Sequence, residues 1–203
     1  EFRRVLFRSS VLEQLMATRG GWQDQVGGIV GGMKISRTVP GLAQRPDIER
    51  LQPCPEFMQA LADRTVLLFT GVQRMARDIL EHVVGRYLAR ERAAMEIVTR
   101  LKAGAEAMCE DVRAGDLDGF ADHLAQYWML KQCFDPAANH PRIEAIVEPH
   151  LRDLQAWELP GAGGGGFVFM LARSPQAATR IRNRVDRQPP GSRARIFPLE
   201  IDS

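Results

Sequence analysis

A dense run of glycines near the C-terminal end constrains the fold of this chain more than any other feature. Five of the six residues from 161 to 166 are glycine, and the apolar run Phe167–Ala172 follows at once. Flexible linkers rarely lead straight into a core strand, so the backbone is expected to pass close to something bulky here. Consecutive glycine amides can also form a concave nest for phosphate oxygens. The cluster therefore predicts a tight turn that enters a buried strand.

Two common nucleotide-binding motifs do not fit this cluster. Gly161, Gly163 and Gly166 have G-x-G-x-x-G spacing, but a dinucleotide-binding fingerprint follows a strand and opens a helix, whereas these glycines precede a strand. A Walker A loop ends in Gly-Lys followed by Ser or Thr, which this cluster lacks. Both motifs are excluded.

A second glycine-rich stretch, residues 20–28, surrounds a single carboxylate. Asp24 lies between Gln23 and Gln25, with a glycine pair on each side. The stretch follows a helix-like segment and precedes a strand-like one, which is a suitable position for an acid that takes part in chemistry. A polar turn without function is the alternative.

Composition is that of an ordinary globular protein. The chain has 203 residues, of which 45% are hydrophobic and 26% charged, enough for one core or for one domain and part of another. A net charge of +2 without a basic aromatic patch argues against a nucleic-acid partner. No apolar run reaches the roughly 18–20 residues that a membrane span needs. Three widely spaced cysteines indicate reduced thiols and a cytoplasmic location, and the four histidines lack metal-ligand spacing, so no metal site is expected.

Strands and helices are predicted to be grouped along the chain. The apolar run Thr65–Thr70 predicts a buried central strand, and residues 72–90 have the apolar spacing of an amphipathic helix. Further helices are expected at about 11–18, 56–63, 93–113, 116–134, 142–154 and 174–185, and further strands at 29–38, 47–52, 167–172 and 195–201. This order predicts an α+β fold with a mainly antiparallel sheet that helices cover on one face.

These motifs, in this order, resemble the GHMP-type sugar kinases, and among them the C-terminal half of the L-fucokinase branch. The similarity lies in Leu12–Leu15 with Gly20–Gln25, in Thr70-Gly71 with residues 74–76 and 83–88, and in the glycines of 161–166. It implies a remnant of the kinase N-terminal domain over residues 11–38 and a ferredoxin-like C-terminal domain over residues 39–203. Residues 1–10 are expected to be a non-native or frayed start.

The resemblance also implies a reaction, the ATP-dependent phosphorylation of L-fucose to fucose 1-phosphate, with ATP and Mg²⁺ as cofactors. Phosphoryl transfer depends on positioning and on a residue that receives or orients the proton of the nucleophile. Asp24 is the expected base or electrostatic anchor. The expected substrate-binding residues are Gly21, Trp22, Gln23, Gln25 and Arg74, and those that pack at the phosphate site are Gly161, Ala162, Gly163, Gly164, Gly165 and Gly166.

Two of these residues have an ordinary structural alternative. Trp22 fits the edge of a core as well as it fits a sugar-stacking face. Arg74, near the start of a helix, fits a solvated helix face.

One part of the family pattern has no counterpart in the sequence. The loop that binds the ATP phosphates, glycine-rich with paired serines, should precede Asp24, and Ser9-Ser10 lacks the glycines. The chain is therefore expected to be a fragment, inactive alone, with most magnesium ligands outside it. The expected partners are a sugar and ATP, without nucleic acid or membrane. The alternatives are a heptose or galactose kinase of the same superfamily, or a non-catalytic sugar-binding or regulatory module.

Overall fold

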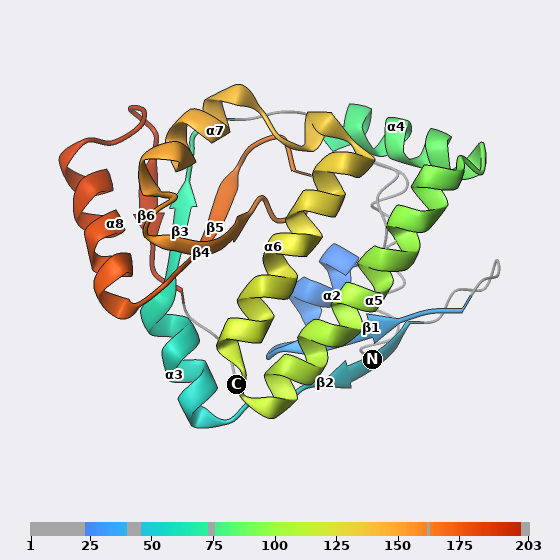
Figure 1. Cartoon of the computed structure of the whole chain (residues 1–203), viewed down its shortest axis with the longest axis horizontal. Coiled ribbons are helices and arrows are strands. Elements are labelled where there is room, and N and C mark those ends of the chain that lie inside the picture. The colour runs from blue at the N-terminus through green and yellow to red at the C-terminus, as the bar shows by residue number, and fades with distance from the viewer. Residues whose placement is uncertain (1–22, 40–45, 73–75, 162, 200–203) are drawn as a thin grey trace. The chain divides into compact units, whose positions relative to one another are not determined.

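The structure, a computed structural model, describes residues 23–39, 46–72, 76–161 and 163–199 (Figure 1). The chain divides into two compact units, and the division falls between Pro53 and Cys54. The helix expected at 11–18 lies outside the described residues. The division into kinase domains at residue 38 stays a prediction.

Over its described residues, the first unit contains one helix and a strand pair. Helix α2 spans Gln23–Ile29, and the strands β1 (Lys34–Arg37) and β2 (Asp47–Arg50) pair antiparallel, as expected. Val26 and Val30 are 2% and 7% exposed and pack with Ile29 and Ile48.

Helix α2 corrects the local structure expected around Asp24. The sequence predicted a glycine-rich turn at 20–28 and a strand from residue 29, whereas Gln23–Ile29 is helical and β1 begins only at Lys34. Val30 directly follows the helix, and its amide donates to the Val26 carbonyl, so the two valines lie on the same side; burying both outweighs the low helix propensity of Gly27 and Gly28.

Over its described residues, the second unit contains six α-helices and a four-stranded sheet. Its α-helices are α3 (Pro55–Arg64), α4 (Ala76–Leu88), α5 (Arg92–Ala114), α6 (Leu117–Phe134), α7 (Pro141–Val147) and α8 (Pro175–Arg187). The strands are β3 (Thr65–Phe69), β4 (Leu154–Glu158), β5 (Phe167–Ala172) and β6 (Arg195–Phe197), and two 3-10 turns, η1 (Pro136–Ala138) and η2 (Glu148–His150), flank α7.

The sheet has the order β4-β5-β3-β6, and every neighbouring pair of strands is antiparallel. Val66 pairs with Met170 and Leu68 with Val168, so these four side chains point to the same face. Helices α6, α7 and α8 bury that face (Figure 1), with side chains that include Trp128, Ile143, Ile146, Val147, Ile181 and Val185. The α+β fold with a mainly antiparallel sheet is confirmed.

Strand β4 was not predicted from the sequence. The helix expected at 142–154 ends at Val147, because Pro149 has no amide hydrogen with which to continue it. The chain then enters β4 at Leu154, with a register shift between Leu154 and Ala156. The shift interrupts the alternation of apolar and polar residues that would have indicated a strand.

The boundary between α5 and α6 follows its sequence signals. Gly115 ends α5 with φ of 73°, in the left-handed region, and Asp116 caps α6 by accepting a hydrogen bond from the Gly119 amide at 2.9 Å. The separate helices predicted at 93–113 and 116–134 are confirmed. Over the described residues, no helix is both long and apolar enough to cross a bilayer.

The burial of the central strand β3 leads to a prediction about stability. Leu68 is 0% exposed in the core, whereas Leu151 is 49% exposed. Leu68→Ala is expected to lower the free energy of unfolding by about 2–5 kcal/mol, since it leaves a cavity in a packed core. The same change at Leu151 should stay within about 0.5 kcal/mol of the unmodified protein. Urea unfolding measures both, and an equal loss at the two positions would contradict the assigned core.

Candidate functional site

The glycine turn, defined as residues 161–166, connects β4 to β5. Its described residues are glycines that all have positive φ: Gly161 (73°), Gly163 (87°), Gly164 (78°), Gly165 (155°) and Gly166 (84°). Residues with a β-carbon rarely adopt such angles. The turn therefore depends on glycine for its backbone conformation.

The turn also depends on glycine for space. A β-carbon at Gly163 would lie 2.5 Å from the carbonyl oxygen of Ala138, and one at Gly165 would lie 2.6 Å from that of Val72. By contrast, a β-carbon at Gly161 or Gly166 would have nothing within 4 Å. The bulky neighbour expected from the sequence is thus the backbone of η1 on one side and of the segment after β3 on the other.

Two amides of the glycine turn form hydrogen bonds within the fold. The Gly164 amide donates to the Ala138 carbonyl at 2.7 Å, and the Gly166 amide donates to the Val72 carbonyl at 2.8 Å. These bonds join the turn to η1 and to the end of β3. A phosphate nest that uses every amide of the turn is therefore excluded, and any phosphate donor must come from its other amides.

Thr70 fixes the end of the turn. It is 4% exposed, and both its amide and its hydroxyl donate to the Gly166 carbonyl, at 2.9 Å and 2.8 Å. The same hydroxyl oxygen accepts a hydrogen bond from the Val72 amide at 3.1 Å. The buried hydroxyl thus has both a donor and an acceptor partner.

A half-buried ionic pair lies just before the turn. The Lys131 ammonium donates to the Leu159 carbonyl at 2.6 Å, and its nitrogen lies 4.0 Å from Glu158 Oε2. The same nitrogen lies 5.4 Å and 5.7 Å from the ring centroids of Trp128 and Tyr127. This pair joins α6 to the last residues before the glycine turn.

Burial perturbs all three titratable groups of this cluster. It lowers the pKa of Lys131, while the charge of Glu158 acts in the opposite direction. It raises the pKa of Glu158 against the influence of Lys131. Burial, with a smaller contribution from Glu158, raises the pKa of Tyr127 to about 12. Tyr127 is therefore a neutral phenol at physiological pH.

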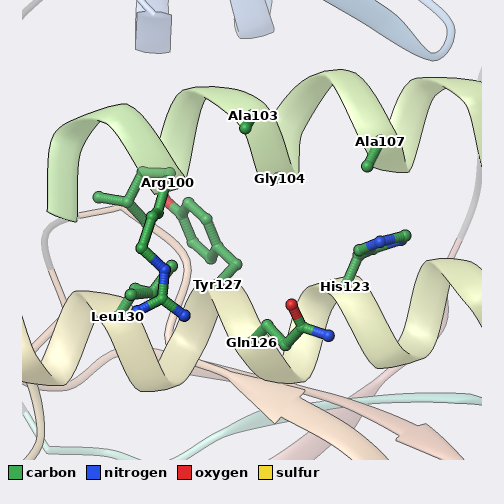
Figure 2. A pocket seen from close by; sticks show the side chains of 9 residues that line it. Arg100, Ala103, Gly104, Ala107, His123, Gln126, Tyr127 and Leu130 are labelled. Carbon is green, nitrogen blue, oxygen red and sulfur yellow. The ribbon is translucent and has the colours of Figure 1, made fainter. Parts of the chain in front are cut away.

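Tyr127 also lines a groove of about 260 Å³ between α5 and α6 (Figure 2). Ala103, Gly104 and Ala107 of α5 face α6 there, and their small size leaves the space open. At its edge, His123 Nδ1 lies 2.6 Å from Asp111 Oδ2. None of the glycines that the structure describes in the glycine turn lines this groove.

The predicted sugar-site residues are only partly described. Gln23 is the first residue of α2 and its side chain is exposed, and Asp24 and Gln25 follow in the first turn of that helix. Nothing further is described of those two side chains. Gly21, Trp22, Arg74 and Ala162 lie outside the described residues. Because Asp24 and the glycine turn belong to different units, their association in one site stays a prediction.

The described side chains form no metal-binding cluster. No group of three or more His, Cys, Asp or Glu residues in that part of the chain is arranged to hold a metal ion. Cys54 and Cys133 are exposed, free thiols.

The chain resembles known proteins in sequence. Residues 105–191 match the family described as GHMP kinases C terminal. Most of the chain is similar in sequence to two fucokinases, so the resemblance to GHMP-type kinases, and to the fucokinases among them, that the motifs predicted is confirmed.

Two of the similar proteins are fucokinases by name. The L-fucokinase/L-fucose-1-P guanylyltransferase of Bacteroides fragilis is 35% identical over 198 residues, which cover 96% of this chain and 20% of that protein. The bifunctional fucokinase/GDP-fucose pyrophosphorylase of Arabidopsis thaliana is 35% identical over 176 residues, covering 87% of this chain and 17% of that protein. The chain thus spans about a fifth of the length of these relatives.

Solved structures agree on the fold. A mevalonate kinase from L. major matches with a TM-score of 0.71 at 15% identity, over 99% of this chain and 59% of that one. A putative sugar kinase from Campylobacter jejuni matches with a TM-score of 0.62 at 21% identity, over 90% of this chain and 49% of that one. Both confirm the predicted fold class.

Sequence reasoning missed the ionic pair and the role of Thr70. The available signal for Lys131 was its position three and four residues after Trp128 and Tyr127, which places a lysine on an aromatic helix face. The contact with Leu159 joins residues far apart in the chain, so no local pattern indicates it.

One glycine of the turn has open space around it and another lies against backbone, which gives a prediction for a pair of matched variants. Gly161→Ala meets open space and should cost roughly 1–2 kcal/mol of unfolding free energy for its positive φ alone. Gly163→Ala has the same backbone cost and also a clash with the Ala138 carbonyl, so its loss should be clearly larger. Urea unfolding of both variants measures the difference. Equal losses would show that the turn does not press against η1.

Proposed function

We propose that the protein containing this chain transfers the terminal phosphoryl group of ATP to L-fucose, giving fucose 1-phosphate. The observation that carries this proposal is the 35% identity to the Bacteroides fragilis L-fucokinase/L-fucose-1-P guanylyltransferase over 96% of the chain. The chain covers one fifth of that protein, so the complete activity is inferred for the longer assembly of domains rather than for these residues alone.

The geometry of the glycine turn supports the proposal that the turn lies beside the phosphates of the nucleotide. Its inner side, at Gly163 and Gly165, packs on backbone, whereas nothing lies within 4 Å of a β-carbon at Gly161 or Gly166. Open backbone of this kind can bring successive amides close to phosphate oxygens. ATP with Mg²⁺ supplies the phosphoryl group and neutralises charge on it. The turn's part is to shape the wall against which the phosphates lie, and most magnesium ligands are expected outside this chain.

Asp24 is assigned to the acceptor sugar. A carboxylate at hydrogen-bond distance from the reacting hydroxyl can accept its proton or orient it for attack. Gln23 and Gln25 flank it and are assigned to the sugar hydroxyls, together with Gly21, Trp22 and Arg74. The small-molecule partners are therefore ATP and a sugar, and a cytoplasmic location belongs to the same proposal.

A heptose kinase is the second candidate. The D-glycero-alpha-D-manno-heptose 7-phosphate kinase of Campylobacter jejuni is 29% identical over 153 residues, which cover 75% of this chain and 44% of that protein. A panel of L-fucose, D-galactose and a heptose phosphate, assayed with the full-length protein and ATP, separates the candidates. Turnover of L-fucose is expected, and turnover of heptose phosphate alone would replace the first proposal by the second.

The sequence contains no serine-paired glycine loop of the kind that binds the ATP phosphates in this family. We therefore expect the 203 residues to lack measurable kinase activity when they are produced alone. Robust phosphorylation of fucose by this chain would overturn that expectation.

Asp24→Asn tests the assigned acid in the full-length protein. Removing the charge should lower kcat by about 10²–10⁴-fold and leave the KM for the sugar nearly unchanged, since general base catalysis contributes that much. The control is Asp47→Asn, the same change at an exposed position of the same unit. Steady-state kinetics measures both variants, and an unchanged kcat in Asp24→Asn removes Asp24 from the role.

A further inference from the structure

Lys131 has a half-buried position that the proposed chemistry does not use. Its side chain is 13% exposed, and its ammonium donates a 2.6 Å hydrogen bond to the carbonyl of Leu159, a residue that is 0% exposed. Leu159 is followed by Pro160 and then by Gly161, the first residue of the glycine turn. The bond therefore holds the backbone two residues before the turn begins.

The surroundings of the ammonium make this bond strong. Burying a lysine is costly unless its charge is compensated, and here the aromatic faces of Trp128 and Tyr127 lie on it. Glu158 supplies the opposite charge at 4.0 Å, yet among the described residues its Oε2 has no hydrogen-bond partner. Glu158 thus acts as a counter-ion, and the Leu159 carbonyl is the acceptor of the charged hydrogen bond.

The rest of the turn is fixed by other segments. The Gly164 amide is bonded to Ala138, the Gly166 amide to Val72, and the Gly166 carbonyl to Thr70. These contacts hold the middle and the end of the turn. Among the described residues, only the start of the turn is held by α6, through the hydrogen bond from Lys131 to the Leu159 carbonyl.

We propose that Lys131 is a positioning residue of the glycine turn, which acts through the Leu159 carbonyl to orient the turn for the phosphates of ATP. The inference rests on the proposed kinase function, because it assigns the turn to nucleotide binding. Lys131 itself touches neither ATP nor sugar in this account.

The test uses three variants of the full-length protein. Lys131→Met removes the donor and keeps the length of the side chain, and Lys131→Arg keeps a charged donor. Lys102→Met makes the same charge change at an exposed position of α5 and is the control. Because Lys131→Met leaves Glu158 buried without its counter-ion, the double variant Lys131→Met/Glu158→Gln is included to preserve folding.

Two readouts follow the turn and the nucleotide separately. Amide hydrogen exchange of Leu159 and Gly161, at the start of the turn, should accelerate by roughly tenfold or more in Lys131→Met and in the double variant, since a hydrogen bond to a charged group contributes at least that factor to an equilibrium. Exchange in α8 should stay unchanged. The KM for MgATP should rise by about tenfold with little change in the KM for the sugar, and Lys131→Arg should restore most of the difference.

The outcomes distinguish the two proposals. If exchange in the turn is unchanged, or if it accelerates equally in α8, Lys131 does not position the turn and the inference fails. If wild-type protein phosphorylates L-fucose and the KM for MgATP does not respond to Lys131→Met, the inference fails while the kinase proposal stands. If wild-type protein phosphorylates no sugar, the kinase proposal fails and the assignment of the turn to nucleotide fails with it.

Discussion

The structure depends on the close contact between the glycine turn and two stretches of backbone. Gly164 and Gly166 donate to the carbonyls of Ala138 and Val72, at 2.7 Å and 2.8 Å, and a β-carbon at Gly163 or Gly165 would collide with these same carbonyls. Backbone can approach backbone this closely only where side chains are absent. The turn thereby joins the end of β3, the segment after α6 and the start of β5 into one rigid corner of the larger unit.

Packing follows from this corner, and the proposed chemistry depends on it. The core strands β3 and β5 leave it side by side, with Leu68 paired to Val168 and both buried under the helices. Thr70 holds the end of the turn from within the sheet, and Lys131 holds its start from α6. A wall of backbone fixed at both ends is preorganised, and preorganised donors and surfaces are what phosphoryl transfer requires.

Sequence alone predicted the parts of this fold that local signals determine. Gly115 and Asp116 marked the α5–α6 boundary, and the apolar run before Thr70 marked the central strand, because each signal acts on its own neighbours. Strand β4 was missed, since a register shift breaks its alternation, and the helix that contains Asp24 was taken for a turn, since its stability comes from buried valines. The glycine turn was recognised as a candidate site. Its partners Ala138, Val72 and Lys131 are distant in sequence and carry no pattern that points to it.

The central claim is that this corner lies against the phosphates of ATP while Asp24 lies against the sugar. A crystal structure of the full-length protein with a non-hydrolysable ATP analogue and L-fucose tests it most directly. We expect a phosphate oxygen within about 3 Å of a backbone nitrogen of the glycine turn, the bonds to Ala138 and Val72 retained, and the Asp24 carboxylate at a similar distance from the anomeric hydroxyl. Phosphates bound away from the turn, or a turn detached from Ala138 and Val72, would contradict the account.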